Sequence, residues 1–239
     1  MNSAARNMAI DHAIMNSVRA GRSSPTIRFY RWKPSAVSIG CFQSMNDEVN
    51  VERCGAAGVA YVRRLTGGGA VYHDINGEIT YSIIGKEELF PKNIIDSYKL
   101  ICNWIIESLS RLGIKAEFAP INDIVVAGKK ISGNAQTRRE GILLQHGTVL
   151  YKVDVGEMFS LLNVAKEKIS DKMIKSAEER VTSVSAHSDA SIEELYAALL
   201  SGFTEGKNFS YGSLSEEEKD EAETLEREIY STYEWNFSR

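Results

Sequence analysis

Three successive glycines, Gly67 to Gly69, separate two stretches of strand-forming residues, and they restrict the fold of this chain more than any other feature. Glycine loses more backbone freedom on folding than any other residue, so a run of three is costly in chain entropy. Such a run is useful where the main chain turns tightly or where its amides approach a bound anion. The glycines alone leave a flexible turn and an anion-binding loop evenly balanced.

The residues around the glycine run favour the anion-binding loop. Arg63 and Arg64 precede the run and would supply fixed positive charge beside it. Guanidinium groups and main-chain amides are common partners of phosphates and carboxylates. The stretch is not a P-loop, because no lysine and hydroxyl pair closes it, and it lacks the spacing of a dinucleotide fingerprint.

The hydrophobic pattern predicts an α+β or mixed α/β domain in which helices cover a sheet. Helices are predicted at residues 5–20, 49–57 and 94–112, with two more capped by Ser191 and Ser215. Strands are predicted at residues 26–31, 36–40, 60–64, 78–84, 123–126 and 141–151. The first two strands flank Lys33-Pro34-Ser35 and predict a hairpin. With no long linker and no repeat, residues 1–239 are predicted to form one domain.

A second informative stretch runs from Asn122 to Gln136. Asp123 leads a predicted strand, and Lys130 follows in a predicted polar loop with Gly128 and Gly133. A single lysine in a loop is usually just solvated. Together these residues suit nucleotide activation of a carboxylic acid, with Asp123 facing Mg²⁺ or a ligand hydroxyl and Lys130 bridging the acyl oxygen and the α-phosphate.

The histidines and cysteines give weaker signals. His146 lies in an apolar strand and His73 beside the glycine run, and a hydrogen-bonded structural role is the favoured interpretation of both. Cys41, Cys54 and Cys102 lack metal-ligand spacing and are odd in number, which favours a reducing compartment. Cys41 at a strand end is a candidate nucleophile, although a small core residue is the commoner role of such a cysteine.

Charge and hydropathy restrict the environment. A net charge of −4 and a pI near 5.7 provide no field that would gather nucleic acid. No apolar run approaches the roughly 20 residues that span a bilayer, and the N-terminus lacks a secretory pattern. We therefore expect a soluble, cytoplasmic protein with no nucleic-acid or membrane partner.

Read together, these stretches resemble the lipoate-protein ligase family, whose glycine-rich motif is similar to Arg63–Asp74 nearly position for position. Further similar segments are residues 7–14, 28–32, 38–40, 122–150 and 175–184. The resemblance implies a biotin/lipoate-protein ligase-like catalytic domain, a mixed β-sheet flanked by helices. It also implies a reaction in two steps: ATP with Mg²⁺ converts lipoate to lipoyl-adenylate, and a lysine of a lipoyl domain then takes the acyl group.

The resemblance also implies roles for individual residues. Lys130 would be the catalytic group, in contact with lipoate and the adenylate phosphate, and Asp123 would lie near the phosphates and the metal. Gly133 and His146 would contact lipoate, whose apolar tail needs a mostly hydrophobic tunnel. The nucleotide and acyl group would be held by Arg64, Gly67, Gly68, Gly69, Ala70, Val71 and Tyr72.

The same resemblance implies which proteins this chain acts on or works with. The implied acceptors are lipoyl domains of 2-oxoacid dehydrogenase E2 subunits or the glycine cleavage H protein. We expect the C-terminal accessory domain of many bacterial ligases to be absent, as in archaeal-type ligases, so a separately encoded small accessory protein is a candidate partner.

The main alternative is an octanoyl or lipoyl transferase, which uses a cysteine thioester and no ATP. Residues 116–122, where the similar transferases carry that cysteine, contain none, whereas Gln136 and Gln145 resemble transferase residues. A biotin-protein ligase and a noncatalytic acyl-carrier binder are less favoured.

Overall fold

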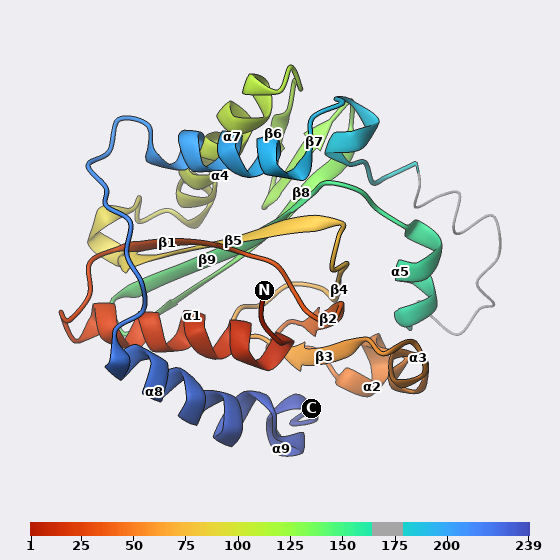
Figure 1. Ribbon diagram of the computed structural model, residues 1–239, viewed down its shortest axis with the longest axis vertical. Helices are drawn as coiled ribbons and strands as arrows, with labels where there is room; N and C mark the ends of the chain where they lie inside the picture. Colours follow the sequence, from red (N-terminus) through yellow and green to blue (C-terminus); the bar gives the residue numbers. More distant parts are fainter. Residues whose placement is uncertain (164–178) are drawn as a thin grey trace.

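The computed structural model describes residues 1–163 and 179–239, and a six-stranded sheet forms its centre (Figure 1). The strand order is β1-β5-β9-β8-β7-β6, and each neighbouring pair is antiparallel. The strands are β1 Thr26–Tyr30, β5 Glu78–Lys86, β6 Glu117–Ala119, β7 Asp123–Val126, β8 Lys129–Arg139 and β9 Ile142–Leu150. Because β5 and β9 are buried along almost their whole length, side chains of both strands contribute to the two faces of the core.

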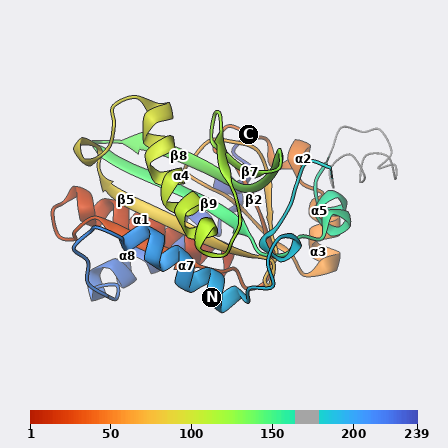
Figure 2. The same ribbon diagram turned by 90° about the horizontal axis from the view of Figure 1, so that it is seen from above.

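Helices cover both faces of this sheet (Figure 2). α1 Ala4–Arg19 lies on one face, and α8 Glu216–Leu225 packs against α1. α4 Ile94–Arg111 and α7 Ile192–Thr204 pack together on the other face. Each face has its own apolar core, one containing Ala13 and Ile14 of α1 and the other containing Ile105 and Phe203. The predicted class, helices covering a sheet, is confirmed.

The predicted helix starts are largely confirmed. Ser191 and Ser215 each form a complete capping box, and Asn93 caps α4 with its side-chain oxygen. The helix predicted at residues 49–57 is α3 Val51–Ala57, which begins two residues later, and a further short helix, α2 Met45–Glu48, precedes it. The remaining helical elements of the described residues are η1 Glu87–Leu89, α5 Val155–Leu161, η2 Val184–Ala186, η3 Glu226–Tyr230 and α9 Tyr233–Asn236.

A smaller sheet corrects the predicted hairpin. β2 Ala36–Ile39 is its central strand, parallel to β3 Ala60–Arg63 and antiparallel to β4 Val71–His73. β1 pairs with β5 of the large sheet, so β1 and β2 do not form a hairpin. All four residues of β2 are buried, and a buried strand needs hydrogen-bond partners on both edges.

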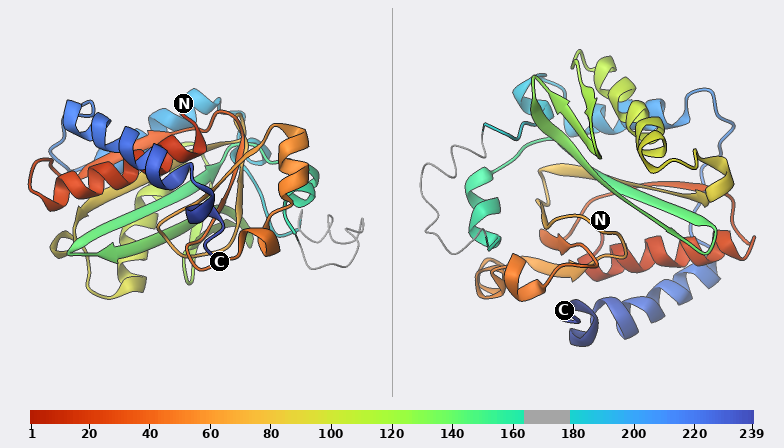
Figure 3. Two further views of the ribbon diagram at one scale, coloured as in Figure 1. Left: turned by 90° about the horizontal axis from the view of Figure 1, so that it is seen from below. Right: turned by 180° about the vertical axis from the view of Figure 1, so that it is seen from behind.

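The predicted polar loop around Lys130 is also corrected. Only Ala127 and Gly128, both with positive φ, form the turn, and residues 129–139 are the strand β8, paired with β7 and β9. Figure 3 shows β8 and β9, in green, running side by side along the sheet. Of the family-like segment 175–184, residues 175–178 lie outside the described residues. Residues 180 and 182 hydrogen-bond the backbone of Lys130.

Candidate acyl-transfer site

The glycine-rich loop joins β3 to β4 and lies against the segment that follows β2. Gly40 approaches this loop so closely that a side chain on it would collide with the carbonyl group of Gly68. Gly68 itself has a φ of +96°, which disfavours residues with a side chain. The amide of Cys41 donates to the carbonyl of Thr66 at 2.9 Å. Two of these glycines are therefore needed for close approach and for backbone conformation.

Arg64 shapes this loop from the inside. Its guanidinium donates to the carbonyl oxygens of Gly67 and Gly69, each at 2.8 Å, to that of Ser38 at 3.1 Å, and to the Thr66 hydroxyl at 3.1 Å. Burial lowers the pKa of Arg64 from its ordinary value to about 10, which leaves it charged at neutral pH. Arg64 lines the pocket, while its donors hold the backbone of the loop.

Arg63 does not supply charge to the same site. Its side chain is 1% exposed and reaches the C-terminal helix α9 and the segment after β2. Its guanidinium donates to five carbonyl oxygens, those of Gly40, Cys41, Gln43, Trp235 and Asn236. The side chain of Asn236 accepts from the Arg63 amide at 2.7 Å, and the Trp235 indole donates to the Arg63 carbonyl at 2.8 Å. The expectation that both arginines flank an anion is therefore wrong for Arg63, which ties the loop region to the chain's C-terminal residues.

Lys130 and Asp123 form the charged part of the opposite wall. The Lys130 Nζ lies 2.7 Å from a carboxylate oxygen of Asp123, and the two side chains are 43% and 33% exposed. Gly133 makes room for the ammonium group, because a Cβ there would lie 2.7 Å from the Lys130 Cε and 2.8 Å from Nζ. The predicted association of Lys130, Asp123 and Gly133 thus exists, with Lys130 on a strand whose backbone is hydrogen-bonded on both sides.

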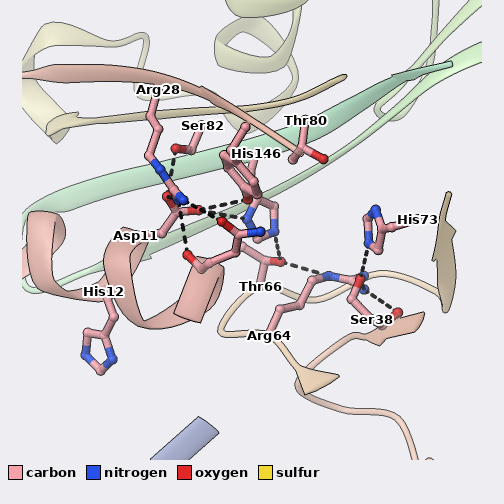
Figure 4. A network of polar contacts seen from close by, with 12 residues as sticks. Asp11, His12, Arg28, Ser38, Arg64, Thr66, His73, Thr80, Ser82 and His146 are labelled. Carbon is pink, nitrogen blue, oxygen red and sulfur yellow. Dashed lines mark hydrogen bonds and ion pairs between the residues drawn. The ribbon is translucent and has the colours of Figure 1, made fainter. Parts of the chain in front are cut away.

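A buried polar network joins the loop to α1 and the large sheet (Figure 4). Asp11 accepts from Arg28 at 2.7 Å and from Tyr30 and Ser82. Burial alone would raise the pKa of Asp11, but Arg28 and His146 outweigh it, so the pKa lies below its ordinary value.

His146 continues this network to the loop. Its Nε2 lies 2.8 Å from the Thr66 hydroxyl, and its Nδ1 lies 3.7 Å from Asp11. Burial lowers the pKa of His146, more than the nearby Asp11 raises it, so the imidazole is neutral at pH 7. The expected structural histidine is therefore integrated with the site, between Asp11 and the loop.

His73 makes a second set of contacts at the inner end of the loop. Its Nε2 lies 2.8 Å from the Ser38 hydroxyl and its Nδ1 lies 2.7 Å from Glu78, while its ring stacks on Trp32. Glu78 also accepts from Thr80, and all of these side chains are buried. His73 is thus a hydrogen-bonded structural group, as expected, and also a wall of the pocket.

A pocket lies between the glycine loop and the Lys130 wall. Its mouth is charged at Lys130, and the residues from α1 and β1 that line it, Met8 and Tyr30, are largely apolar. The lining residues are Met8, Tyr30, Trp32, Ser38, Arg64, Gly68, Gly69, Ala70, Val71, His73, Thr80, Asn122, Lys130, Gly133, Asn134, Ala135, His146, Gly147 and Thr148. An apolar interior with a few polar groups is the usual form of a site for a small amphipathic ligand.

Most predicted site residues line this pocket, and three do not. Gly67 contributes its carbonyl to Arg64, Tyr72 is buried in the core of the small sheet, and Asp123 contacts the pocket only through Lys130. Asn122 and Asn134 were assigned no role from the sequence, and the structure places both in the wall of the pocket. A signal was available for Asn134, because a buried polar residue in a strand needs a hydrogen-bond partner, whereas Asn122 lies in the turn before β7.

Thiols and metal ligands restrict the chemistry of the site. None of the three cysteines lines the pocket in the described part of the chain. Cys54 and Cys102 are buried, and burial raises the pKa of Cys102 to about 12. Within residues 1–163 and 179–239 no group of three or more acidic, histidine or cysteine side chains could hold a metal ion. A Mg²⁺ ion at Asp123 would therefore need most of its ligands from a bound phosphate or from water.

The model of the lipoyl protein ligase A/B catalytic domain matches residues 3–204, so this chain belongs to that family. Its fold and pocket define an enzyme of the lipoate ligase and transferase group. Two solved structures agree closely. A bi-partite lipoate protein ligase from Thermoplasma acidophilum has a TM-score of 0.91 and 34% identity, covering 99% of this chain and 94% of that one. A lipoate-protein ligase A bound with ATP has a TM-score of 0.85 and 32% identity, covering 99% and 96%.

Curated relatives carry a different activity in their names. The octanoyltransferase LipM of Brevibacillus brevis is 36% identical, covering 99% of this chain and 96% of that protein. LipM of Kyrpidia tusciae is also 36% identical with the same coverage. These names favour the transferase alternative over the predicted ATP-dependent ligase. Separately, no helix in the described part of the chain is long and apolar enough to cross a membrane.

Proposed function

We propose that this chain transfers an octanoyl or lipoyl group to a lysine of a lipoyl-domain protein by direct attack of the lysine amine on a bound, activated acyl carbonyl. One observation carries the proposal: Lys130 and the glycine-loop backbone line the pocket, and no cysteine does so among the described residues. An acyl-enzyme needs a nucleophile at the carbonyl. Direct attack needs only an activated donor and a group that stabilises the developing oxyanion.

Lys130 is suited to stabilise that oxyanion. Its ammonium group is a point charge at the pocket mouth, and Asp123 holds Nζ in place. As the acceptor amine attacks, negative charge develops on the acyl oxygen and interacts more strongly with Lys130 than the neutral carbonyl did. The amine proton leaves with the departing group. The acyl tail would extend towards Met8 and Trp32, in the part of the pocket between α1 and the sheets.

A carrier-bound octanoyl thioester is the first candidate donor. The curated relatives named octanoyltransferase match this chain over nearly their whole length. A thioester is already activated for aminolysis, so transfer from it requires neither ATP nor Mg²⁺. In this chain such a transfer would differ from thioester relay through an enzyme cysteine, because no thiol of the described residues lines the pocket.

An acyl-adenylate is the second candidate donor. The solved structures named lipoate protein ligase, one of them bound with ATP, favour it. ATP with Mg²⁺ would supply the adenylate leaving group, and the Gly68–Val71 backbone and Lys130 are placed to hold its phosphate. One neighbour is described together with an E2 lipoyl domain and as bi-partite, so an E2-type acceptor and a separate accessory protein belong to this proposal for the present chain.

The test supplies an apo lipoyl domain with each donor in turn and follows the acceptor's mass. The donors are octanoyl carrier protein without ATP, lipoate or octanoate with ATP and Mg²⁺, and synthetic acyl-adenylate. Lysine acylation that needs Lys130 and survives Cys41→Ser supports the proposal, and the productive donor identifies the transferase or the ligase. Transfer from adenylate alone would indicate a ligase core that lacks its partner. No transfer from any donor, or transfer abolished by Cys41→Ser, would overturn direct attack.

A further inference from the structure

Three residues stand opposite one another in the centre of the large sheet: Tyr81 of β5, Gly147 of β9 and Asn134 of β8. The Tyr81 hydroxyl crosses the intervening strand and donates to the Asn134 Oδ1 at 2.7 Å. A Cβ at position 147 would collide with that amide oxygen and would lie 2.8 Å from the Tyr81 ring. Gly147 is therefore the gap through which Tyr81 reaches Asn134.

Asn134 connects Tyr81 to the wall of the pocket that contains Lys130. Its Nδ2 donates to the Asn122 carbonyl at 2.8 Å, and the Asn122 Nδ2 donates back to the Asn134 carbonyl. Both asparagines line the pocket. Asn122 immediately precedes Asp123, whose carboxylate holds the Lys130 Nζ. The reciprocal asparagine pair thus fixes the backbone from which Asp123 reaches Lys130.

Hydrogen bonds on the other side of Tyr81 all run in the same direction. Arg138 Nε donates to Gln136, Gln136 Nε2 to Gln145 at 2.9 Å, and Gln145 Nε2 to the Tyr81 oxygen at 2.7 Å. Arg138 itself is anchored on the Pro91 carbonyl at 2.6 Å. Hydrogen bonds arranged head to tail polarise one another. Gln136 and Gln145, which resemble transferase residues, therefore have a physical role in this chain: they orient Tyr81.

The middle of this chain of hydrogen bonds is buried. Tyr81 and Gln145 are fully buried. Burial also raises the pKa of Tyr81 well above its ordinary value, so its oxygen keeps a proton to donate. Without that hydroxyl, the Gln145 donor and the Asn134 acceptor would both lose a buried partner, and the asparagine pair could adopt other orientations.

We propose that Tyr81 is a positioning residue for acyl transfer: through Asn134 and Asn122 it sets where Asp123 holds the Lys130 ammonium group. Its kinetic consequence rests on the proposed function. Tyr81 is not one of the residues that line the pocket, so its removal should change the geometry of the transition-state contact more than the binding of the acyl tail. A small displacement of a charge-stabilising group is enough to slow a reaction substantially.

Tyr81→Phe removes one oxygen atom and tests this role. Tyr230→Phe is the matched control, because Tyr230 is equally buried and its hydroxyl lies 3.2 Å from His12, away from the pocket. We expect Tyr81→Phe to lower kcat about tenfold with little change in KM for the acyl donor. Tyr230→Phe should lower thermal stability to a similar extent and leave kcat unchanged. Equal kcat for Tyr81→Phe and the wild type would overturn the inference.

A double-mutant cycle and a spectroscopic measurement separate positioning from general loosening. If Tyr81 acts through Asn134, Tyr81→Phe has no further effect on kcat in an Asn134→Ala background, whereas additive effects contradict the inference. The side-chain amide NMR signals of Asn122 and Asn134 should shift in Tyr81→Phe and not in Tyr230→Phe. These signals do not depend on turnover, so unchanged signals would refute the inference, and shifted signals in a protein that transfers from no donor would refute only the proposed function.

Discussion

The two walls of the pocket use positive charge in opposite ways. On the glycine-loop side, Arg64 lines the pocket and Arg63 lies behind it; both are buried, and their guanidinium groups are occupied by protein carbonyl oxygens and hydroxyls. On the other wall, Lys130 is partly exposed, and its charge faces the pocket beside a single carboxylate. The arginines build the shape of the site, whereas the lysine is available to the reaction. Charged residues next to a glycine motif are therefore not necessarily ligand contacts.

Removing Arg63 should produce the largest effect, and the effect should be on stability. Arg63→Ala leaves five carbonyl oxygens without their donor and opens a cavity between α9 and the segment after β2. We expect the free energy of unfolding to fall by about 4 kcal/mol, measured by chemical denaturation. The exposed Arg53→Ala is the control and should change it by less than about 0.5 kcal/mol. A loss below about 1 kcal/mol would show that the C-terminal residues do not secure the loop.

Removing Lys130 should have the opposite result, a large loss of activity with little loss of stability. We expect Lys130→Ala to reduce kcat for acyl transfer roughly 100-fold, the scale of one lost oxyanion contact, with the unfolding curve nearly unchanged. Lys130→Arg should recover part of the rate if charge alone matters. Lys152→Ala, an exposed lysine outside the pocket lining, should transfer at the wild-type rate. A stable Lys130→Ala enzyme with normal kcat would remove the distinction between the two walls.

Much of the Lys130 wall could be predicted from sequence, whereas the arginine contacts could not. Lys130, Asp123 and Gly133 lie within one short stretch, and a β-turn brings them together. Two of the five carbonyl acceptors of Arg63, those of Trp235 and Asn236, instead lie more than 170 positions away in the sequence. A local pattern records that a residue is charged. It does not record which distant carbonyls surround it.

The same limit explains the two errors in the fold. Helix caps such as Ser191 and Ser215 are local and were predictable. The division of β1 and β2 between two sheets depends on partners at β5 and β3, which adjacent hydrophobic runs do not reveal. β8 resembled a loop because its polar residues face the pocket and Asn122 rather than solvent.

Crowding Lys130 without removing it tests whether its position matters as well as its charge. A Cβ at position 133 would lie within 3 Å of the Lys130 Cε and Nζ, the flexible end of that side chain. The side chain can move aside at little cost, so we expect Gly133→Ala to lower kcat about tenfold while changing stability by less than about 1 kcal/mol. Gly55→Ala, where a Cβ meets nothing within 4 Å, is the matched control. Wild-type kcat in Gly133→Ala would mean that the ammonium group needs no fixed position.

The smallest predicted effect is on the pH dependence of stability, and it arises from His146 in the buried wall of the pocket. Burial lowers the pKa of His146 below its ordinary value of 6.5, so the unfolded chain binds a proton there more readily than the folded chain does. The stability contributed by neutral His146 is therefore fully present above pH 6.5 and is lost as the pH falls from there through the folded pKa.

The pKa of His12 is also lowered, again mainly through burial. The stability contributed by Asp11 is lost only when the pH falls below 3.8, the ordinary pKa of that carboxyl group. Denaturation between pH 7 and pH 5 thus reports on the histidines. His146→Gln should reduce the dependence of unfolding free energy on pH without abolishing it, because His12 still titrates. If the unfolding free energy of His146→Gln and of the wild type changed equally with pH, His146 would take up a proton as readily in the folded state as in the unfolded state. It would then place a second positive charge on the wall beside Arg64.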